Sequence, residues 1–108
     1  MNLAQKKCVA CEGGMPPLSR TEAEVLLRET PLWQLSPDAE RISRRFSFPD
    51  FAAALAFVNR VGALAEAEGH HPDVSFGWGY VQVVLTTHAA GGLSENDLIL
   101  AAKIDTIG

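Results

Sequence analysis

Apolar residues recur along the chain with two different spacings, and the alternation between these spacings predicts the secondary structure. Helical spacing predicts helices at 20–30, 51–68 and 95–105. A strict alternation of apolar and polar residues, typical of half-buried strands, predicts strands at 32–35, 40–48, 74–76 and 80–88. Pairs of strands separated by helices favour an α+β fold, in which two hairpins form a four-stranded antiparallel sheet with the three helices packed on one face (α-β-β-α-β-β-α).

Polar residues and glycines mark the expected helix ends. Ser19 and Glu22 have the spacing of a capping box, in which each side chain accepts a hydrogen bond from the other residue's backbone. Ser94 and Asp97 repeat this spacing before the last helix, with aspartate in place of glutamate. Gly69 suits the left-handed conformation that often ends a helix. On the long helix, the stripe expected to face the sheet consists of Phe51, Ala54, Leu55, Val58, Val61, Gly62 and Ala65.

The last predicted strand is apolar on one face and gathers polar residues towards its end. One face carries Val81, Val83, Leu85 and Thr87. The other face carries Tyr80, Gln82, Val84, Thr86 and His88. We expect the first face to be buried, and His88 to end the strand just before the loop that contains Gly91 and Gly92.

Length and composition are those of one compact domain. The chain has 108 residues, of which 47% are hydrophobic and 20% are charged. Residues 1–17 are expected to form an irregular arm, because glycine and proline pairs interrupt them, and residues 18–108 a single domain. The net charge of -4 argues against nucleic-acid binding, which normally needs a basic face. No apolar run approaches a membrane span and no secretory signal is visible, so the cytoplasm is the expected location.

All three histidines lie at the ends of predicted elements. Histidine exchanges protons near neutral pH, so His70, His71 and His88 are candidates for one acid–base site. Pro72 disfavours a helical conformation at His71, and an extended backbone sends neighbouring side chains to opposite sides. His70 and His71 are therefore expected to do different jobs. The alternatives are histidines that are structural or merely exposed, and an Asp97 that serves only as a helix cap.

Cys8 and Cys11 form a C-x-x-C pair in the arm. Such a pair can be half of a zinc site, a redox pair or neither. A structural zinc site normally needs four ligands, and the chain has no second C-x-x-C. The β-α context of a redox motif is also missing. We therefore expect neither a metal nor a cofactor, and a metal site that recruits histidines stays open as an alternative.

The chain also resembles the pterin-4a-carbinolamine dehydratases. The resemblance covers residues 18–106. Its most specific part is the pair of adjacent histidines, followed by a third histidine after a strand and by an aspartate beyond it. The matching positions are Glu66, His70-His71-Pro72-Asp73, Gly77-Trp78-Gly79, Thr87-His88, Gly92-Leu93-Ser94 and Asn96-Asp97.

This resemblance implies a reaction, an assembly and a site. Members dehydrate a 4a-hydroxytetrahydropterin, of the 4a-hydroxytetrahydrobiopterin type, to the quinonoid dihydropterin, and they form dimers or tetramers. An aromatic amino-acid hydroxylase releases this substrate, so the reaction supports tetrahydropterin recycling, and the pterin is a substrate and not a cofactor. The implied catalytic residues are His70, His71, His88 and Asp97. The implied substrate-binding residues are Glu66, Pro72, Thr86 and Thr87.

The chemistry suggests how these residues divide the work. Loss of hydroxide from C4a needs an acid for the leaving oxygen and a base for a ring nitrogen proton, and we expect His71 and His88 to be this pair. His70 would orient the pterin or share that role, and Asp97 would hold one imidazole in the useful tautomer. The alternative function is that of a non-catalytic protein-assembly or dimerisation partner of the same fold. Three intact histidines and Asp97 favour catalysis.

Overall fold

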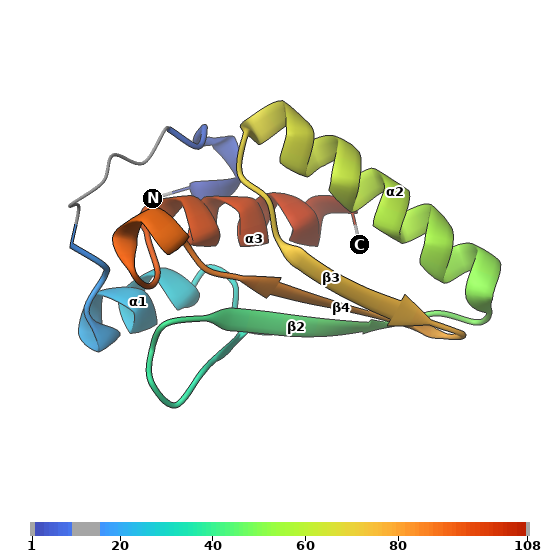
Figure 1. The fold of residues 1–108 in the computed structure, drawn as a ribbon, viewed down its shortest axis with the longest axis horizontal. Helices are drawn as coiled ribbons and strands as arrows, with labels where there is room; N and C mark the ends of the chain where they lie inside the picture. The colour runs from blue at the N-terminus through green and yellow to red at the C-terminus, as the bar shows by residue number, and fades with distance from the viewer. Residues whose placement is uncertain (1, 10–15, 108) are drawn as a thin grey trace.

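The computed structural model describes residues 2–9 and 16–107 (Figure 1). Within these residues the α-helices are α1 (Arg20–Leu27), α2 (Phe51–Glu68) and α3 (Glu95–Ile107). The strands are β1 (Gln34–Leu35), β2 (Ile42–Ser47), β3 (Asp73–Gly77) and β4 (Tyr80–Leu85). Two short 3-10 helices are η1 (Leu3–Gln5) and η2 (His88–Ala90). None of the helices in the described ranges is long and apolar enough to cross a membrane.

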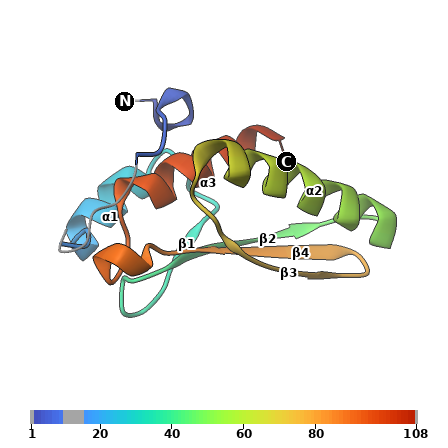
Figure 2. The ribbon, with the colours of Figure 1, turned by 45° about the horizontal axis from the view of Figure 1, so that its top comes forward.

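The strands form one antiparallel sheet in the order β1-β2-β4-β3. β1 pairs with β2 and β3 pairs with β4, and the contact between β2 and β4 joins the two hairpins. Val81, on the central strand β4, lies opposite Phe46 on β2 and Phe76 on β3. Viewed close to edge-on, the sheet carries all three α-helices on one face (Figure 2). The predicted α+β fold is confirmed.

The core lies between that face of the sheet and the helices. Val81, Val83 and Leu85 of β4 are fully buried, as the alternation predicted. α3 is buried along most of its length, and Leu98 and Ile104 are both completely covered. α3 therefore lies in the middle of the molecule, and its first turn begins beside the loop that follows β4.

The buried stripe of α2 is rotated relative to the prediction. Its buried residues are Ala54, Phe57, Val61 and Ala65. Phe51 and Leu55, which were expected in the stripe, are 46% and 40% exposed, whereas Phe57 is fully buried. The ring of Phe57 packs between Phe46 and Phe48, with centroid distances of 4.6 and 5.1 Å. Because α2 is apolar around most of its circumference, spacing alone does not identify the sheet-facing side, and this aromatic contact decides it.

The predicted capping box of α1 and the predicted glycine stop of α2 are confirmed. The Ser19 hydroxyl accepts a hydrogen bond from the Glu22 N–H at 3.1 Å, and the Glu22 carboxylate accepts one from the Ser19 N–H at 2.8 Å. Asp50 caps α2 by accepting a hydrogen bond from the Ala53 N–H at 2.8 Å. Gly69 follows α2 in the left-handed conformation, with φ of 67°. This turn directs the chain out of α2 immediately before the first histidine.

β4 is shorter than predicted, which changes the setting of His88. The strand ends at Leu85 and not at residue 88. Thr87 and Gly92 form an isolated antiparallel bridge, and the residues between them include η2. Gly91, with φ of 72°, allows this loop to close. His88 therefore begins a 3-10 turn and does not end a strand.

The described part of the arm, residues 2–9, is not irregular throughout, which corrects the prediction. It contains η1, which lies against α3 and whose Leu3 is fully buried in the core (Figure 1). The Lys103 ammonium donates a hydrogen bond to the Ala4 carbonyl at 2.9 Å, and the Leu3 N–H donates one to the Glu29 carboxylate at 2.9 Å. An apolar side chain that inserts into the core thus ties down a segment without helical or strand periodicity.

Candidate functional site

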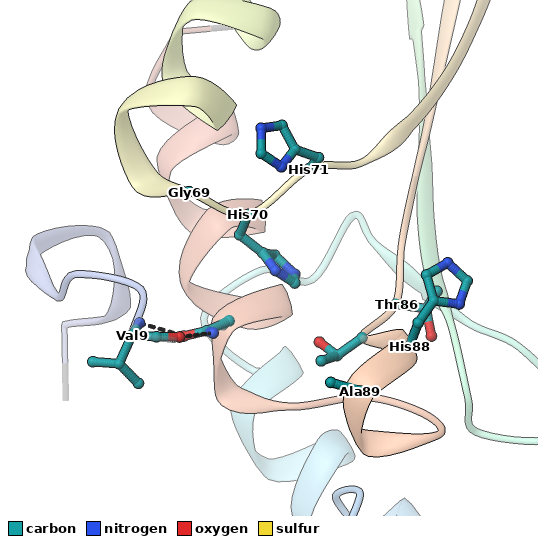
Figure 3. A pocket seen from close by; sticks show the side chains of 9 residues that line it. Val9, Gly69, His70, His71, Thr86, His88 and Ala89 are labelled. Atoms are coloured by element: carbon teal, nitrogen blue, oxygen red, sulfur yellow. Dashed lines mark hydrogen bonds between the residues drawn. The ribbon is translucent and has the colours of Figure 1, made fainter. Parts of the chain in front are cut away.

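A pocket of about 290 Å³ opens where the ends of several elements meet (Figure 3). The exit of α2, the segment after β4 and the first turn of α3 supply most of its wall, and the arm supplies the remainder. Its lining residues are Val9, Gly69, His70, His71, Thr86, Thr87, His88, Ala89 and Asn96. The three histidines proposed from the sequence thus line one pocket.

The buried residue Asp97 is hydrogen-bonded to one of these histidines, His70. Its carboxylate is completely buried, and Oδ1 lies 2.6 Å from Nε2 of His70, whose side chain is 12% exposed. A carboxylate only accepts hydrogen bonds, so Nε2 of His70 is the donor. The other ring nitrogen of His70, Nδ1, takes no part in this contact. The other carboxylate oxygen accepts hydrogen bonds from the Thr87 hydroxyl at 2.8 Å and from the Ser94 N–H at 2.9 Å. Asp97 is therefore both the helix cap and the partner of a site histidine.

His71 has a different partner and a different environment. Its Nε2 is hydrogen-bonded to the carboxylate of Glu66, in the last turn of α2. Both side chains are exposed, His71 by 59% and Glu66 by 78%. Figure 3 shows the rings of His70 and His71 pointing in opposite directions from the extended backbone. The two adjacent histidines thus differ in burial and in partner. That they do different jobs stays a prediction.

His88 stands apart from the other two histidines. It projects from η2 on the far side of the pocket from His71 (Figure 3). Its side chain is exposed, and no residue of the described ranges donates or accepts a hydrogen bond at its ring. A second hollow, of about 190 Å³, borders His88 and Thr86 on their other side and reaches Glu40 and Arg41. The ring of His88 is therefore free to meet a ligand.

The predicted substrate-binding residues separate into two groups. Thr86 and Thr87 line the pocket. Glu66 reaches the pocket only through His71, and Pro72 is not among the lining residues. Four lining residues were not predicted as site residues: Val9, Gly69, Ala89 and Asn96. The position of Asn96 beside Asp97 in a first helical turn was a usable signal, whereas Val9 lies in an arm without periodicity.

The cysteine arm places a half-buried thiol, that of Cys8, next to the lining residue Val9. Burial and the neighbouring Glu68 carboxylate raise the pKa of the Cys8 thiol to about 12. The thiol therefore stays protonated at neutral pH, which disfavours the thiolate that metal binding or redox chemistry requires. Cys11, the other half of the predicted pair, lies outside the described residues. Within those residues, no three His, Cys, Asp or Glu side chains lie close enough together to hold a metal ion.

Comparison with known protein families identifies relatives along the full chain. The family model described as pterin 4 alpha carbinolamine dehydratase matches residues 16–107. A protein of Halorhodospira halophila, provisionally named a pterin-4-alpha-carbinolamine dehydratase, is 53% identical over 108 residues, which are 100% of this chain and 99% of that protein. A protein of Methylococcus capsulatus with the same provisional name is 50% identical over 106 residues, which are 98% of this chain and 93% of that protein.

Solved structures share the fold. A crystal structure of a transcriptional coactivator/pterin dehydratase from Brucella melitensis superposes with a TM-score of 0.79 at 34% identity, over 84% of this chain and 97% of that one. A pterin dehydratase-like protein, described as a RuBisCO assembly factor in the alpha-carboxysome, gives 0.55 at 32% identity, over 69% and 84%. The fold and the pocket define a small α+β protein with three histidines around a pocket at one end of its sheet. The chain belongs to the pterin-4-alpha-carbinolamine dehydratase family.

Proposed function

We propose that the protein is a hydro-lyase that dehydrates a 4a-hydroxytetrahydropterin, of the tetrahydrobiopterin type, to the quinonoid dihydropterin. The observation that carries this proposal is the pocket lined by three imidazoles, one of which is fixed by a buried carboxylate. Membership of the family supports the same reaction. The proposal goes further than the family in assigning the acid–base work to particular histidines.

The reaction needs one proton delivered and one removed. The C4a–O bond breaks and the hydroxyl leaves as water after it receives a proton. The proton on the adjacent ring nitrogen departs, and its electron pair forms the new double bond to C4a. The step breaks a C–O bond without passing electrons to an acceptor, so it needs no redox cofactor. Each well-placed acid or base contributes about 10²–10⁴-fold to such a step.

We assign the proton transfers to His71 and His88, whose exposed rings can reach a bound pterin and exchange protons with water. The hydrogen bond to the Glu66 carboxylate holds the His71 ring in place. His70 is nearly buried and is held by Asp97, so it orients the pterin ring. Thr86 and Thr87 line the wall between the histidines and contribute to substrate binding.

The test is a stopped-flow ultraviolet assay in which a hydroxylase generates the 4a-hydroxytetrahydropterin in situ. His71→Ala and His88→Ala should each lower the enzyme-catalysed rate by about 10²-fold or more. Val25→Ala, at an exposed position on α1 outside the pocket, is the control and should keep full activity. Full turnover by both histidine variants would sink the assignment.

The same proposal places the protein in tetrahydropterin recycling. Its substrate is the product that an aromatic amino-acid hydroxylase releases, and this reaction belongs in the cytoplasm. Deleting the gene in a cell that depends on such a hydroxylase should lower its sustained hydroxylation rate. An unchanged rate in cells whose dehydratase activity is lost would argue against the hydroxylase link.

Exposed apolar side chains favour a homodimer or homotetramer. Trp78, on the turn between β3 and β4, is 72% exposed, and Phe51 and Leu55 of α2 are 46% and 40% exposed. β3 is an edge strand whose outer side has no partner strand among the described residues. Light scattering that finds only monomers at micromolar concentration would refute this assembly.

A second candidate function, that of a protein-assembly partner, uses the same exposed surface and is compatible with catalysis. One relative in structure is described as a RuBisCO assembly factor. A pull-down with the wild type and with Trp78→Ala separates the two functions. Loss of partner capture without loss of dehydration would favour an assembly role, and capture of no partner by either protein would leave catalysis as the only function.

A further inference from the structure

The N-terminal arm crosses the two helix ends that carry the pair His70–Asp97. The Cys8 N–H donates a hydrogen bond to the Glu68 carboxylate at 3.0 Å, and Glu68 is the last residue of α2. One residue further on, the Val9 N–H donates to Oδ1 of Asn96 at 3.0 Å, and Nδ2 of Asn96 donates to the Val9 carbonyl at 2.5 Å. Dashed lines in Figure 3 mark the bonds to Val9. The arm thus bridges the exit of α2 and the first turn of α3.

These contacts lie directly behind the site. Glu68 precedes His70 by two residues, and Asn96 is the neighbour of Asp97 in the chain. Asn96 is only 4% exposed, so its amide exchanges hydrogen bonds with the arm away from bulk water. Val9 itself lines the pocket on the opposite side of His70 from His88 (Figure 3).

The arm is anchored upstream of this bridge by other contacts. Leu3 is fully buried, and Lys103 holds the carbonyl of Ala4. Lys6 forms a more exposed ion pair with Glu95 at 3.2 Å. A segment that is already fixed on α3 therefore leads into residues 8 and 9, and Val9 lines the pocket.

We propose that Cys8, Val9 and Asn96 form a clamp that sets the spacing between His70 and Asp97, with Asn96 as a positioning residue for catalysis. This inference rests on the proposed function where it concerns turnover. The clamp holds α2 and α3 at a fixed separation at the one point where a histidine on the α2 exit must meet a carboxylate in α3. Without it, the two helix ends separate or rotate, and the 2.6 Å contact between Nε2 and Oδ1 is lost for part of the time.

Two variants remove the clamp in different ways. Asn96→Leu keeps the approximate size of the side chain and removes both of its bonds to Val9. Val9→Pro removes the Val9 N–H from the arm and leaves Asn96 unchanged. It therefore still tests the clamp if Asn96→Leu, at a buried position, prevents folding. Lys6→Ala is the matched control, because it deletes another contact between the arm and α3 that lies outside the pocket.

The first readout does not depend on activity. Exchange of the His70 ring N–H with water, followed by NMR on the full chain, should be at least tenfold faster in Asn96→Leu and Val9→Pro than in the wild type and Lys6→Ala. The second readout is dehydration, in which kcat should fall at least fivefold in the two clamp variants, with a changed pH–rate profile, and stay unchanged in Lys6→Ala.

The outcomes separate the clamp from the proposed function. Faster ring N–H exchange in the clamp variants, together with a wild type that does not accelerate dehydration, would retain the clamp and reject the proposed reaction. A wild type without a protected ring N–H, or equal exchange in all four proteins, would overturn the clamp whatever their activity. If the clamp variants lost thermal stability while ring N–H exchange of His70 and kcat stayed unchanged, Asn96 would have a structural role only. That outcome would also overturn the clamp.

Discussion

Replacing Asp97 by asparagine changes one atom at the centre of the site and tests how His70 is held. The carboxylate accepts three hydrogen bonds, from His70, Thr87 and the Ser94 backbone. Asparagine can keep its carbonyl oxygen towards Thr87 and Ser94, which places its NH₂ group against Nε2 of His70. Two donors then face each other unless the imidazole moves its proton to Nδ1. Asp97→Asn therefore removes one charge-assisted hydrogen bond and favours the wrong tautomer.

The size of the effect follows from that single bond. A hydrogen bond to a charged group contributes about 1.5–3 kcal/mol. If the whole contribution is felt in the transition state, kcat/KM falls by about 10- to 150-fold, since about 1.4 kcal/mol corresponds to a factor of ten. The same loss in the folded state lowers the melting temperature by about 4 °C per kcal/mol in a domain of this length.

The matched control is Asp105→Asn at the other end of α3. Asp105 accepts hydrogen bonds from the Trp33 indole at 2.8 Å and from Arg44 at 2.6 Å, and none of the three residues lines the pocket. Both variants are assayed for dehydration at 25 °C after circular dichroism has shown that they are folded. Wild-type kcat/KM in Asp97→Asn, or an equal rate loss in Asp105→Asn, would contradict the reasoning.

Four further predictions concern stability and reactivity. In a Cys11→Ser background, Cys8 should be alkylated by iodoacetamide about 10³-fold more slowly in the folded than in the unfolded protein, because its pKa is raised from 9.0 to about 12. The raised pKa also means that stability should fall as pH rises from 9.0 towards about 12, which urea titrations can measure; equal alkylation rates would refute both statements. Thr30→Val should raise the free energy of unfolding by about 1 kcal/mol, because the fully buried Thr30 hydroxyl has no hydrogen-bond partner within the described ranges; a loss of stability would count against this account. Gly69→Ala should lower the free energy of unfolding by about 1 kcal/mol in the same urea titration. The cause is the φ of 67° alone, because an added Cβ meets no atom within 4 Å. An unchanged midpoint would contradict this prediction.

Local rules explain why most of the fold could be predicted from the sequence. The Ser19 capping box, the Gly69 stop and the alternation of β4 each depend on a few neighbouring residues. The rotation of α2 could not be predicted in this way, because the contact of Phe57 with Phe46 and Phe48 joins segments that are distant in sequence. Leu3 shows the same limit, since its burial against α3 leaves no periodic signal in the arm.

The candidate site could be predicted in its residue types but not in its pairings. The three histidines and Asp97 were identified from spacing and from the family resemblance, and the pocket lined by the histidines brings them together. Asp97 is hydrogen-bonded to His70, and Glu66 is hydrogen-bonded to His71. These pairings depend on the directions of the side chains after the α2 exit, which residue spacing does not determine. Val9 and Asn96 enter the site through a contact between residues 87 positions apart, which no local pattern reveals.

We propose that this pocket dehydrates a 4a-hydroxytetrahydropterin. The most direct measurement is the first-order decay of that compound by stopped-flow ultraviolet absorbance, at increasing concentrations of the wild-type protein. The decay rate should rise above the spontaneous rate in proportion to the concentration of wild-type protein. With the double variant His71→Ala/His88→Ala it should stay at the spontaneous rate. A decay rate that stays at the spontaneous value at every concentration of folded wild-type protein would contradict the proposal.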